Sequence, residues 1–167
     1  MSEDTYALRP FLPADAIALR ELFAQSIEEL TQDDYTEDQR AAWASRALDG
    51  DAFANRLSSQ LTLVVQMDGE YMGFASLKDG GVLDMLYVHP YHAGIGVGTA
   101  LANALEKIAA ARGKTEITLE ASDSAVEFFE GRGYVATSRT LIPIEDEWLA
   151  NSQMKKLLQS SAAKAAQ

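Results

Sequence analysis

The feature that most constrains this chain is a strand-like run that passes through closely spaced glycines into a long amphipathic run, within residues 86–108 (LYVHPYHAGIGVGTALANALEKI). Leu101, Leu105 and Ile108 recur at helical spacing and predict a helix with one apolar face. Gly113 stands where a left-handed cap would end that helix. The sequence therefore predicts a strand, a tight glycine turn and a long helix, in that order.

Gly94, Gly96 and Gly98 remove side chains at alternate positions just before this helix. The first amides of a helix have no partner within it and carry the positive end of the helix dipole, so an anion such as a phosphate could approach them closely here. A dinucleotide fingerprint would need glycine in place of Thr99, and a phosphate-binding loop would need a Gly-Lys-Ser/Thr run, which is absent. The turn therefore predicts an anion site of another kind, with a glycine turn that binds no ligand as the alternative.

Other segments alternate between helical and strand-like patterns. Residues 14–30 predict a helix through the spacing of Ile17, Phe23, Ile27 and Leu30. Two further helices are predicted over 37–48, opened by a Thr36–Gln39 capping box, and over 51–59. Strands are predicted over 5–11, 61–67, 71–77, 82–88, 115–121, 134–140 and 151–158, with a hairpin turn at 68–70 and a short helix over 124–133.

Composition limits the classes of protein that fit. With 167 residues, 47% of them hydrophobic, the chain predicts a single domain over 1–158 and a frayed tail over 159–167. It has no cysteine, which excludes a disulfide framework, a thiolate zinc site and a cysteine nucleophile, and no metal is expected. The net charge of −11 argues against nucleic acid as a partner and favours a cationic one. An acidic start and no long apolar run predict a cytoplasmic protein that does not enter a membrane.

The segment LYVHPYHAGIGVGTALANALEKIAAARG resembles the acetyl-CoA-binding segment of the GNAT N-acetyltransferase superfamily, and the likeness extends through almost the whole chain. It implies the α/β (α+β) acyl-CoA N-acyltransferase fold, with a mixed, mostly antiparallel sheet of six to seven strands flanked by helices. Ala93 stands where the family motif usually has Gln or Arg. As in many relatives, a homodimer is a further expectation.

The resemblance also implies which residues bind acetyl-CoA. Positions that match Leu86, Tyr87 and Val88 bind its acetyl and pantetheine end through backbone groups, and a strand edge can pair with such amides as another strand would. The positions implied for the pyrophosphate are Gly94, Ile95, Gly96, Val97, Gly98 and Thr99. Ser122 matches a cofactor-contacting Asn, with a helix N-cap as its alternative role. Phe129 stands where relatives carry a tyrosine that acts as general acid, and Tyr134 matches a packing aromatic residue.

Asp84 is the strongest candidate for a catalytic residue, because a carboxylate interrupts the apolar run VLDMLYV two residues before Leu86, on the same predicted strand face. It could act as a base, directly or through water, or hold the charge of the amine. The alternative is an Asp at the sheet margin paired with a nearby Arg or backbone N–H. Tyr87 is a candidate proton donor for the leaving thiolate.

Acceptor recognition in the superfamily usually comes from the first helices and the last strands. Here these regions offer carboxylate, aromatic and amide side chains, namely Asp34, Tyr35, Trp43 and Asn151. The expected function is acetyl-CoA-dependent acetylation of a primary amine by direct attack in a ternary complex. The alternative is a non-catalytic module that binds acetyl-CoA or CoA and serves regulation or protein interaction, which the residues Ala93 and Phe129 motivate.

Overall fold

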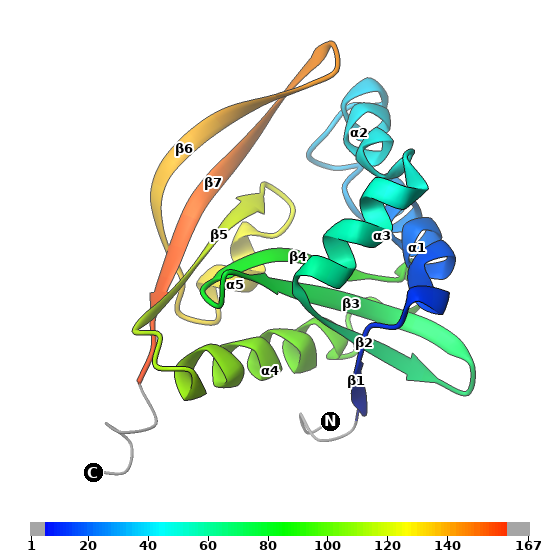
Figure 1. Cartoon of the computed structure of the whole chain (residues 1–167). Helices are drawn as coiled ribbons and strands as arrows, with labels where there is room; N and C mark the ends of the chain where they lie inside the picture. The colour runs from blue at the N-terminus through cyan, green and yellow to red at the C-terminus, as the bar shows by residue number, and fades with distance from the viewer. Residues whose placement is uncertain (1–5, 160–167) are drawn as a thin grey trace.

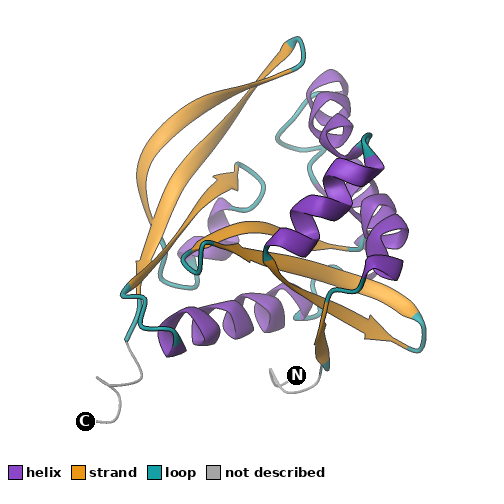
Figure 2. Ribbon diagram, in the orientation of Figure 1, coloured by secondary structure: helices purple, strands orange, loops and turns teal. Residues whose placement is uncertain are grey.

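The computed structural model describes residues 6–159, in which seven strands form one mixed sheet with helices on both faces (Figures 1 and 2). The helices are α1 (Ala16–Leu30), α2 (Glu37–Ala44), α3 (Gly50–Ser59), α4 (Val97–Ala111) and α5 (Val126–Glu130). The strands are β1 (Leu8–Pro10), β2 (Leu61–Met67), β3 (Glu70–Lys78), β4 (Val82–Val88), β5 (Glu116–Ser122), β6 (Val135–Ile144) and β7 (Glu147–Leu157). Most of the tail expected to fray, residues 160–167, lies outside the described residues.

The strands are ordered β1-β2-β3-β4-β5-β7-β6. Every neighbouring pair is antiparallel except β4 and β5, which run parallel. The predicted fold class, a mixed and mostly antiparallel sheet flanked by helices, is therefore confirmed. None of the helices in the described part of the chain is both long and apolar enough to cross a bilayer.

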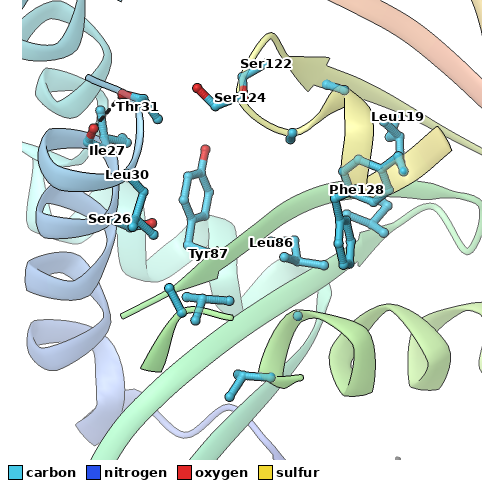
Figure 3. Close-up of a pocket in the computed structure, with 18 of the residues that line it drawn as sticks. Ser26, Ile27, Leu30, Thr31, Leu86, Tyr87, Leu119, Ser122, Ser124 and Phe128 are labelled. Atoms are coloured by element: carbon cyan, nitrogen blue, oxygen red, sulfur yellow. Dashed lines mark hydrogen bonds between the residues drawn. The ribbon is translucent and has the colours of Figure 1, made fainter. Parts of the chain in front are cut away.

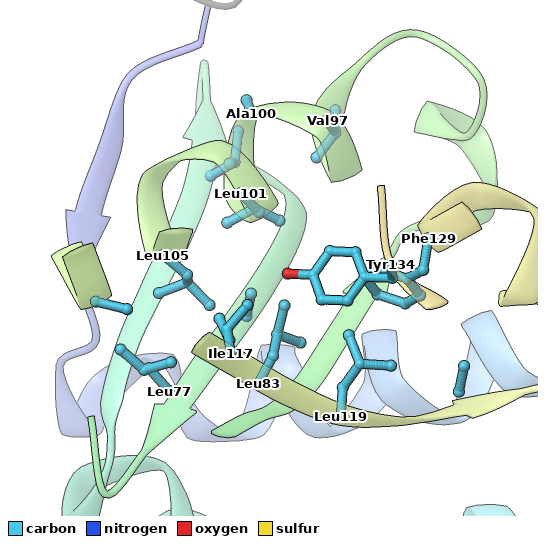
Figure 4. Close-up of a cluster of buried hydrophobic side chains, with 14 of the residues drawn as sticks. Leu77, Leu83, Val97, Ala100, Leu101, Leu105, Ile117, Leu119, Phe129 and Tyr134 are labelled. Carbon is cyan, nitrogen blue, oxygen red and sulfur yellow. The ribbon is translucent and has the colours of Figure 1, made fainter. Parts of the chain in front are cut away.

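Two apolar cores lie on opposite faces of the sheet. One packs α4 against β3, β4 and β5 and includes Leu101 and Leu105, as the helical spacing predicted (Figure 4). The other lies under α1 and α3. Gly73 of β3 allows α4 to approach closely, because a Cβ on it would lie 2.9 Å from Val97 Cγ1 and 3.0 Å from the Tyr87 carbonyl oxygen.

Helix α1 buries a different set of residues from the one predicted. Phe23 and Ile27 are buried, but Ile17 is 75% exposed and Leu30 is 40% exposed. At roughly 100° per residue, Ile17 lies about 120° around the helix from Phe23, so the two cannot share a face. The buried face uses Leu19 and Leu22 instead.

Two predicted helix ends are confirmed. The Gln39 amide donates to Thr36 Oγ1 at 3.1 Å, and the Thr36 amide donates to Gln39 Oε1 at 2.9 Å, which is the capping box that opens α2. Gly113, just after α4, has a φ of +85°, the left-handed conformation that its position predicted. Both ends follow from residues within a few positions of each other, which is why sequence alone locates them.

Asp15 is buried and fully paired near the start of the chain. Arg9 donates to both carboxylate oxygens at 2.8 Å, and the Tyr71 hydroxyl and the Leu12 amide also donate at 2.8 Å. These bonds, the Arg9 bond above all, lower the pKa of Asp15 to about 2 against the opposing effect of burial. The carboxylate therefore favours the folded state at neutral pH.

We expect Asp15→Asn to lower the free energy of unfolding at pH 7 by about 2.5 kcal/mol. Since the folded pKa lies below the unfolded value of about 3.9, this contribution is complete above pH ~5 and is lost as pH falls through about 2. Denaturant unfolding from pH 7 to pH 2 measures it, with exposed Asp33→Asn as the control. An unchanged pH dependence in Asp15→Asn would contradict the assignment.

Candidate functional site

The sheet opens between β4 and β5 (Figure 1). The two strands pair only at Val82 with Thr118 and at Leu83 with Leu119. From Asp84 to Val88, the edge of β4 that would face β5 has no strand partner among residues 6–159. Backbone donors and acceptors along this edge are therefore free to pair with a ligand.

A cavity of about 530 Å³ occupies one side of this opening, and we call it the first cavity (Figure 3). Its walls are the free end of β4, the glycine turn with the start of α4, the end of α1, and Leu119–Ser122 with α5. Of the residues expected to bind acetyl-CoA, all line this cavity except Ile95, whose side chain is 44% exposed. The structure thus brings together the free strand edge and the glycine turn.

The three glycines of the turn serve different purposes. Gly94 and Gly96 have φ values of +79° and +93°, which L side chains rarely adopt. Gly98 has an ordinary helical backbone, and a Cβ there would make ordinary contacts at 3.6 Å with Leu86 and Phe128. The backbone conformation therefore requires glycine at Gly94 and Gly96. At Gly98 the missing side chain leaves space at the cavity wall.

Helix α4 begins with free amides at this turn. Its first backbone bond runs from the Ala100 amide to the Gly96 carbonyl, at 3.0 Å. The amides of Val97, Gly98 and Thr99 come earlier and have no backbone partner in the described part of the chain. Together with the helix dipole, they make an anion site at the cavity wall.

A second cavity, of about 450 Å³, lies between the segment around α2, the end of α3 and the β6–β7 hairpin. Its lining includes Trp43, Arg46, Arg56, Ile142 and Asn151. The two cavities share several lining residues, namely Trp43, Leu83, Asp84, Tyr87, Leu119, Glu120 and Ser122. They are therefore neighbours across the free end of β4.

Asp84 is the extra residue of a β-bulge in β4. Ser76 pairs with Met85 and the next residue, Leu77, pairs with Leu83, which leaves Asp84 without a partner on β3. The expectation that Asp84 shares a face with Leu86 is therefore wrong: Leu83 and Leu86 pack in the α4 core, whereas Asp84 contacts α3 on the other face. The bulge breaks the alternation from which the face was predicted.

The Asp84 carboxylate uses one oxygen for structure and leaves the other open. Arg56 Nε and Nη2 lie 2.9 Å and 2.8 Å from Oδ2, and Gln60 Nε2 donates to the same oxygen at 2.8 Å. Oδ1 has no hydrogen-bond partner among the described residues, and the side chain is 21% exposed at the two cavities. The pairing with an arginine that was the alternative role for Asp84 is present, and it fixes a carboxylate that still has one free acceptor.

Tyr87 lies between the cavities. Its ring packs against Phe23, Phe74 and Trp43, with ring centroids 4.6, 5.7 and 6.3 Å away. Its hydroxyl points toward the loop that carries Ser124 (Figure 3). Burial raises the pKa of this hydroxyl, and the opposing effects of Trp43, Arg56 and Arg46 are smaller. The phenol therefore stays protonated at neutral pH and can donate.

The residues expected to bind the acceptor separate into three groups. Trp43 lines both cavities, and Tyr35 and Asn151 line the second. Asp34 lines neither cavity, which does not match the expectation that it contacts the acceptor, and its Oδ2 accepts from Ser124 Oγ at 2.7 Å.

Tyr35 fastens the loop before α2 to the rest of the fold. Its hydroxyl donates to the Ala150 carbonyl at 2.6 Å and accepts from the Asp123 amide at 2.8 Å. Burial raises the pKa of this hydroxyl to about 12. The Asn151 Oδ1 accepts from Thr140 Oγ1, so the Tyr35 hydroxyl and this oxygen line the second cavity with partners already in place.

Residues near α5 differ in part from expectation. Ser122 is the last residue of β5 and lines both cavities, but Ala125 precedes α5, so the N-cap alternative for Ser122 is wrong. Phe129 is buried against Phe128 and Tyr134, with no phenol at that place. Tyr134 is a packing residue as expected, and its hydroxyl donates to Glu106 at 3.0 Å.

Sequence reasoning missed the basic residues of the second cavity. Arg46 and Arg56 lie in the helices predicted over 37–48 and 51–59, and neither was among the acceptor candidates. The sequence offered one indication of them. Basic residues are fewer than acidic residues in this chain, 14 against 25. Between residues 6 and 159, no group of three or more His, Cys, Asp or Glu side chains is placed to hold a metal.

Comparison with known proteins gives consistent matches. Residues 31–158 match the model of the acetyltransferase (GNAT) domain family. A curated relative, the uncharacterized N-acetyltransferase YafP of Escherichia coli, is 26% identical over 148 residues, which cover 89% of this chain and 93% of that one.

Solved structures match over nearly the whole chain. A GCN5-related N-acetyltransferase from Rhodopseudomonas palustris is 54% identical, with a TM-score of 0.91, over 95% of this chain and 99% of that one. The PaiA N-acetyltransferase of Thermoplasma acidophilum, solved with coenzyme A, has the same fold at 20% identity and a TM-score of 0.74, over 94% and 99% of the two chains.

Proposed function

The chain belongs to the GNAT acetyltransferase family, and we propose that it transfers the acetyl group of acetyl-CoA to a primary amine by direct attack in a ternary complex. The observation that carries the proposal is the free edge of β4 beside the glycine turn, within one cavity. Acetyl-CoA is a long thioester with amides along its arm and phosphates at its far end. The free strand edge suits the amides, and the glycine turn suits the phosphates.

The residues of the first cavity fit acetyl-CoA. The free amides of Val97, Gly98 and Thr99 suit its pyrophosphate, and the open edge of Leu86–Val88 suits the amides of its pantetheine arm. A related protein of the same fold was solved with coenzyme A, which supports this proposal. When bound, acetyl-CoA supplies an activated acyl group as a thioester.

The chain's own residues would manage the protons. Asp84 Oδ1 is open to accept a proton from the amine, directly or through water, or to hold its positive charge, while Arg56 and Gln60 keep the carboxylate in place. Tyr87 stays protonated, because burial raises its pKa, and its hydroxyl can donate a hydrogen bond to a departing thiolate. A backbone N–H on the free edge of β4 can stabilise charge on the reacting carbonyl oxygen. The chain has no cysteine to accept the acetyl group, which favours direct attack.

The test is release of free thiol from acetyl-CoA with a panel of primary amines. We expect release that requires an amine and that yields one N-acetyl product for each thiol, identified by mass spectrometry. Calorimetry with acetyl-CoA and CoA is run alongside. If both bind but no amine is acetylated, the non-catalytic CoA-binding module, which Phe129 in place of a phenol favours, replaces this proposal.

A further inference from the structure

The second cavity has a charge that differs from that of the whole chain. The chain carries a net charge of −11, yet three cationic side chains face this cavity, namely Arg46, Arg56 and Lys78. Net charge is an average over a whole surface, whereas a ligand responds to the groups within a few ångströms. The expectation of a cationic acceptor came from the net charge of the chain. The charged side chains that line the cavity are the better guide to the acceptor.

Three carboxylates line the same cavity, namely Asp79, Asp84 and Glu120. Arg56 is paired with Asp84 at 2.8 Å. Glu120 accepts from the neutral amide of Gln153 at 2.7 Å. Lys78 ends β3 and Asp79 follows it, and no ion pair joins them in the described part of the chain.

Of the two arginines that line this cavity, Arg46 is the one without a carboxylate partner among the described residues. Its guanidinium has no ion pair or hydrogen bond among residues 6–159. Arg46 lies in the turn between α2 and α3. Its positive charge lowers the pKa of the Tyr87 hydroxyl, an effect smaller than that of burial. A free guanidinium at a cavity wall is a donor fork suited to a carboxylate.

The rest of the lining is mixed: polar side chains such as Thr118, Ser122 and Gln153 stand beside apolar and aromatic ones. Trp43 and Phe23 line one side, and Ile142, Ile144 and Leu149 line the side formed by the β6–β7 hairpin. Gln39 Nε2 donates to the Trp148 carbonyl at 2.9 Å and joins α2 to the hairpin there. A volume of about 450 Å³ is within the range of small-molecule sites and accommodates a molecule of amino-acid size.

We propose that the acceptor is an amine that also carries a carboxylate and an apolar body, with the carboxylate bound by Arg46, the body held between Trp43 and the hairpin, and the amine directed at Asp84. This inference rests on the proposed function and names its substrate class. An α-amino acid with a large apolar side chain has all three features.

Matched pairs of acceptors test the proposal. Each pair keeps the body and removes only the carboxylate: phenylalanine and phenethylamine, leucine and isopentylamine, tryptophan and tryptamine, with spermidine as the cationic acceptor. We expect kcat/KM to be at least ~30-fold higher for the carboxylate-bearing member of the preferred pair, the size of a lost charged hydrogen-bond pair. Arg46→Gln removes most of this difference and changes kcat/KM for the amine without carboxylate less than threefold. Arg112→Gln, on the exposed end of α4, is the control.

Binding provides a second readout that does not depend on turnover. The chain has two tryptophans, and Trp148 is 59% exposed, so Trp148→Phe leaves Trp43 as the reporter of the cavity. With CoA present, 3-phenylpropionate, which has the body and the carboxylate but no amine, is expected to change Trp43 fluorescence saturably. Arg46→Gln in this background is expected to weaken that binding at least tenfold.

The outcomes separate the inference from the function on which it rests. Acetylation of the amines that lack a carboxylate, spermidine included, in preference to the carboxylate-bearing amines overturns the inference and leaves the acetyltransferase intact. An equal effect of Arg46→Gln and Arg112→Gln, or no binding of 3-phenylpropionate, also overturns it. Acetylation of no member of the panel, with acetyl-CoA bound, overturns the proposed function and the inference together.

Discussion

Replacing Gly96 with valine is expected to lower the affinity for acetyl-CoA and CoA at least 100-fold while the protein remains folded. Gly96 precedes α4 with a φ of +93°, and a β-branched residue cannot hold that angle without strain of roughly 1–2 kcal/mol. Relief of the strain is expected to rotate the amides of Val97 and Gly98 away from the cavity. Loss of two hydrogen bonds to a charged group, at about 1.5–3 kcal/mol each, accounts for this factor.

Gly113 is the matched control for this experiment. It lies at the other end of α4 with a φ of +85° and open space around its Cβ position, so Gly113→Val applies the same backbone strain away from the cavities. Calorimetric titration should show parent-like affinity for Gly113→Val, and denaturant unfolding should show similar losses of stability for both variants. If Gly96→Val binds acetyl-CoA as the parent does, the cofactor does not use these amides.

The parts of the fold that sequence predicted depend on near neighbours. The capping box of α2 and the left-handed end of α4 are each specified within a few residues, and so is the glycine turn. Alternation and hairpin turns likewise indicated most of the strands and their antiparallel order. The cofactor residues could be predicted because one continuous segment supplies most of them, and that segment lines one cavity.

The parts that sequence missed depend on register and on distant segments. The bulge at Asp84 arises from how β3 pairs with β4, and no residue within VLDMLYV predicts it. The hydroxyl of Tyr35 is occupied by Ala150 and Asp123, which lie far along the chain. Arg46 becomes a candidate only because the β6–β7 hairpin folds back over α2 and encloses a cavity there. Acceptor recognition is therefore less readable from sequence than cofactor binding.

The bulge gives Asp84 a position that a regular strand would deny it. In unbroken alternation its side chain would point to the same face as Leu86, into the α4 core, where a carboxylate would be buried without a partner. The extra residue turns it toward Arg56 and Gln60 and exposes Oδ1 at both cavities. Bulges often re-aim side chains beside active sites, and here the re-aimed group is a carboxylate with one oxygen held and the other open.

Asp84→Asn is therefore expected to lower kcat by about 10²–10⁴-fold with little change in CoA affinity, because the amide keeps the shape of the carboxylate but cannot accept the proton. Glu120→Gln removes the same charge from a residue that lines the same cavities, and it should change kcat less than threefold. Steady-state kinetics measure the effect on turnover and calorimetry measures the affinity for CoA. A raised KM with kcat unchanged would show that Asp84 only holds the charge of the amine, and unchanged kinetics would remove it from the reaction. A fall in kcat in Asp84→Asn alone would show that the position created by the bulge, rather than negative charge in the cavities, carries the chemistry.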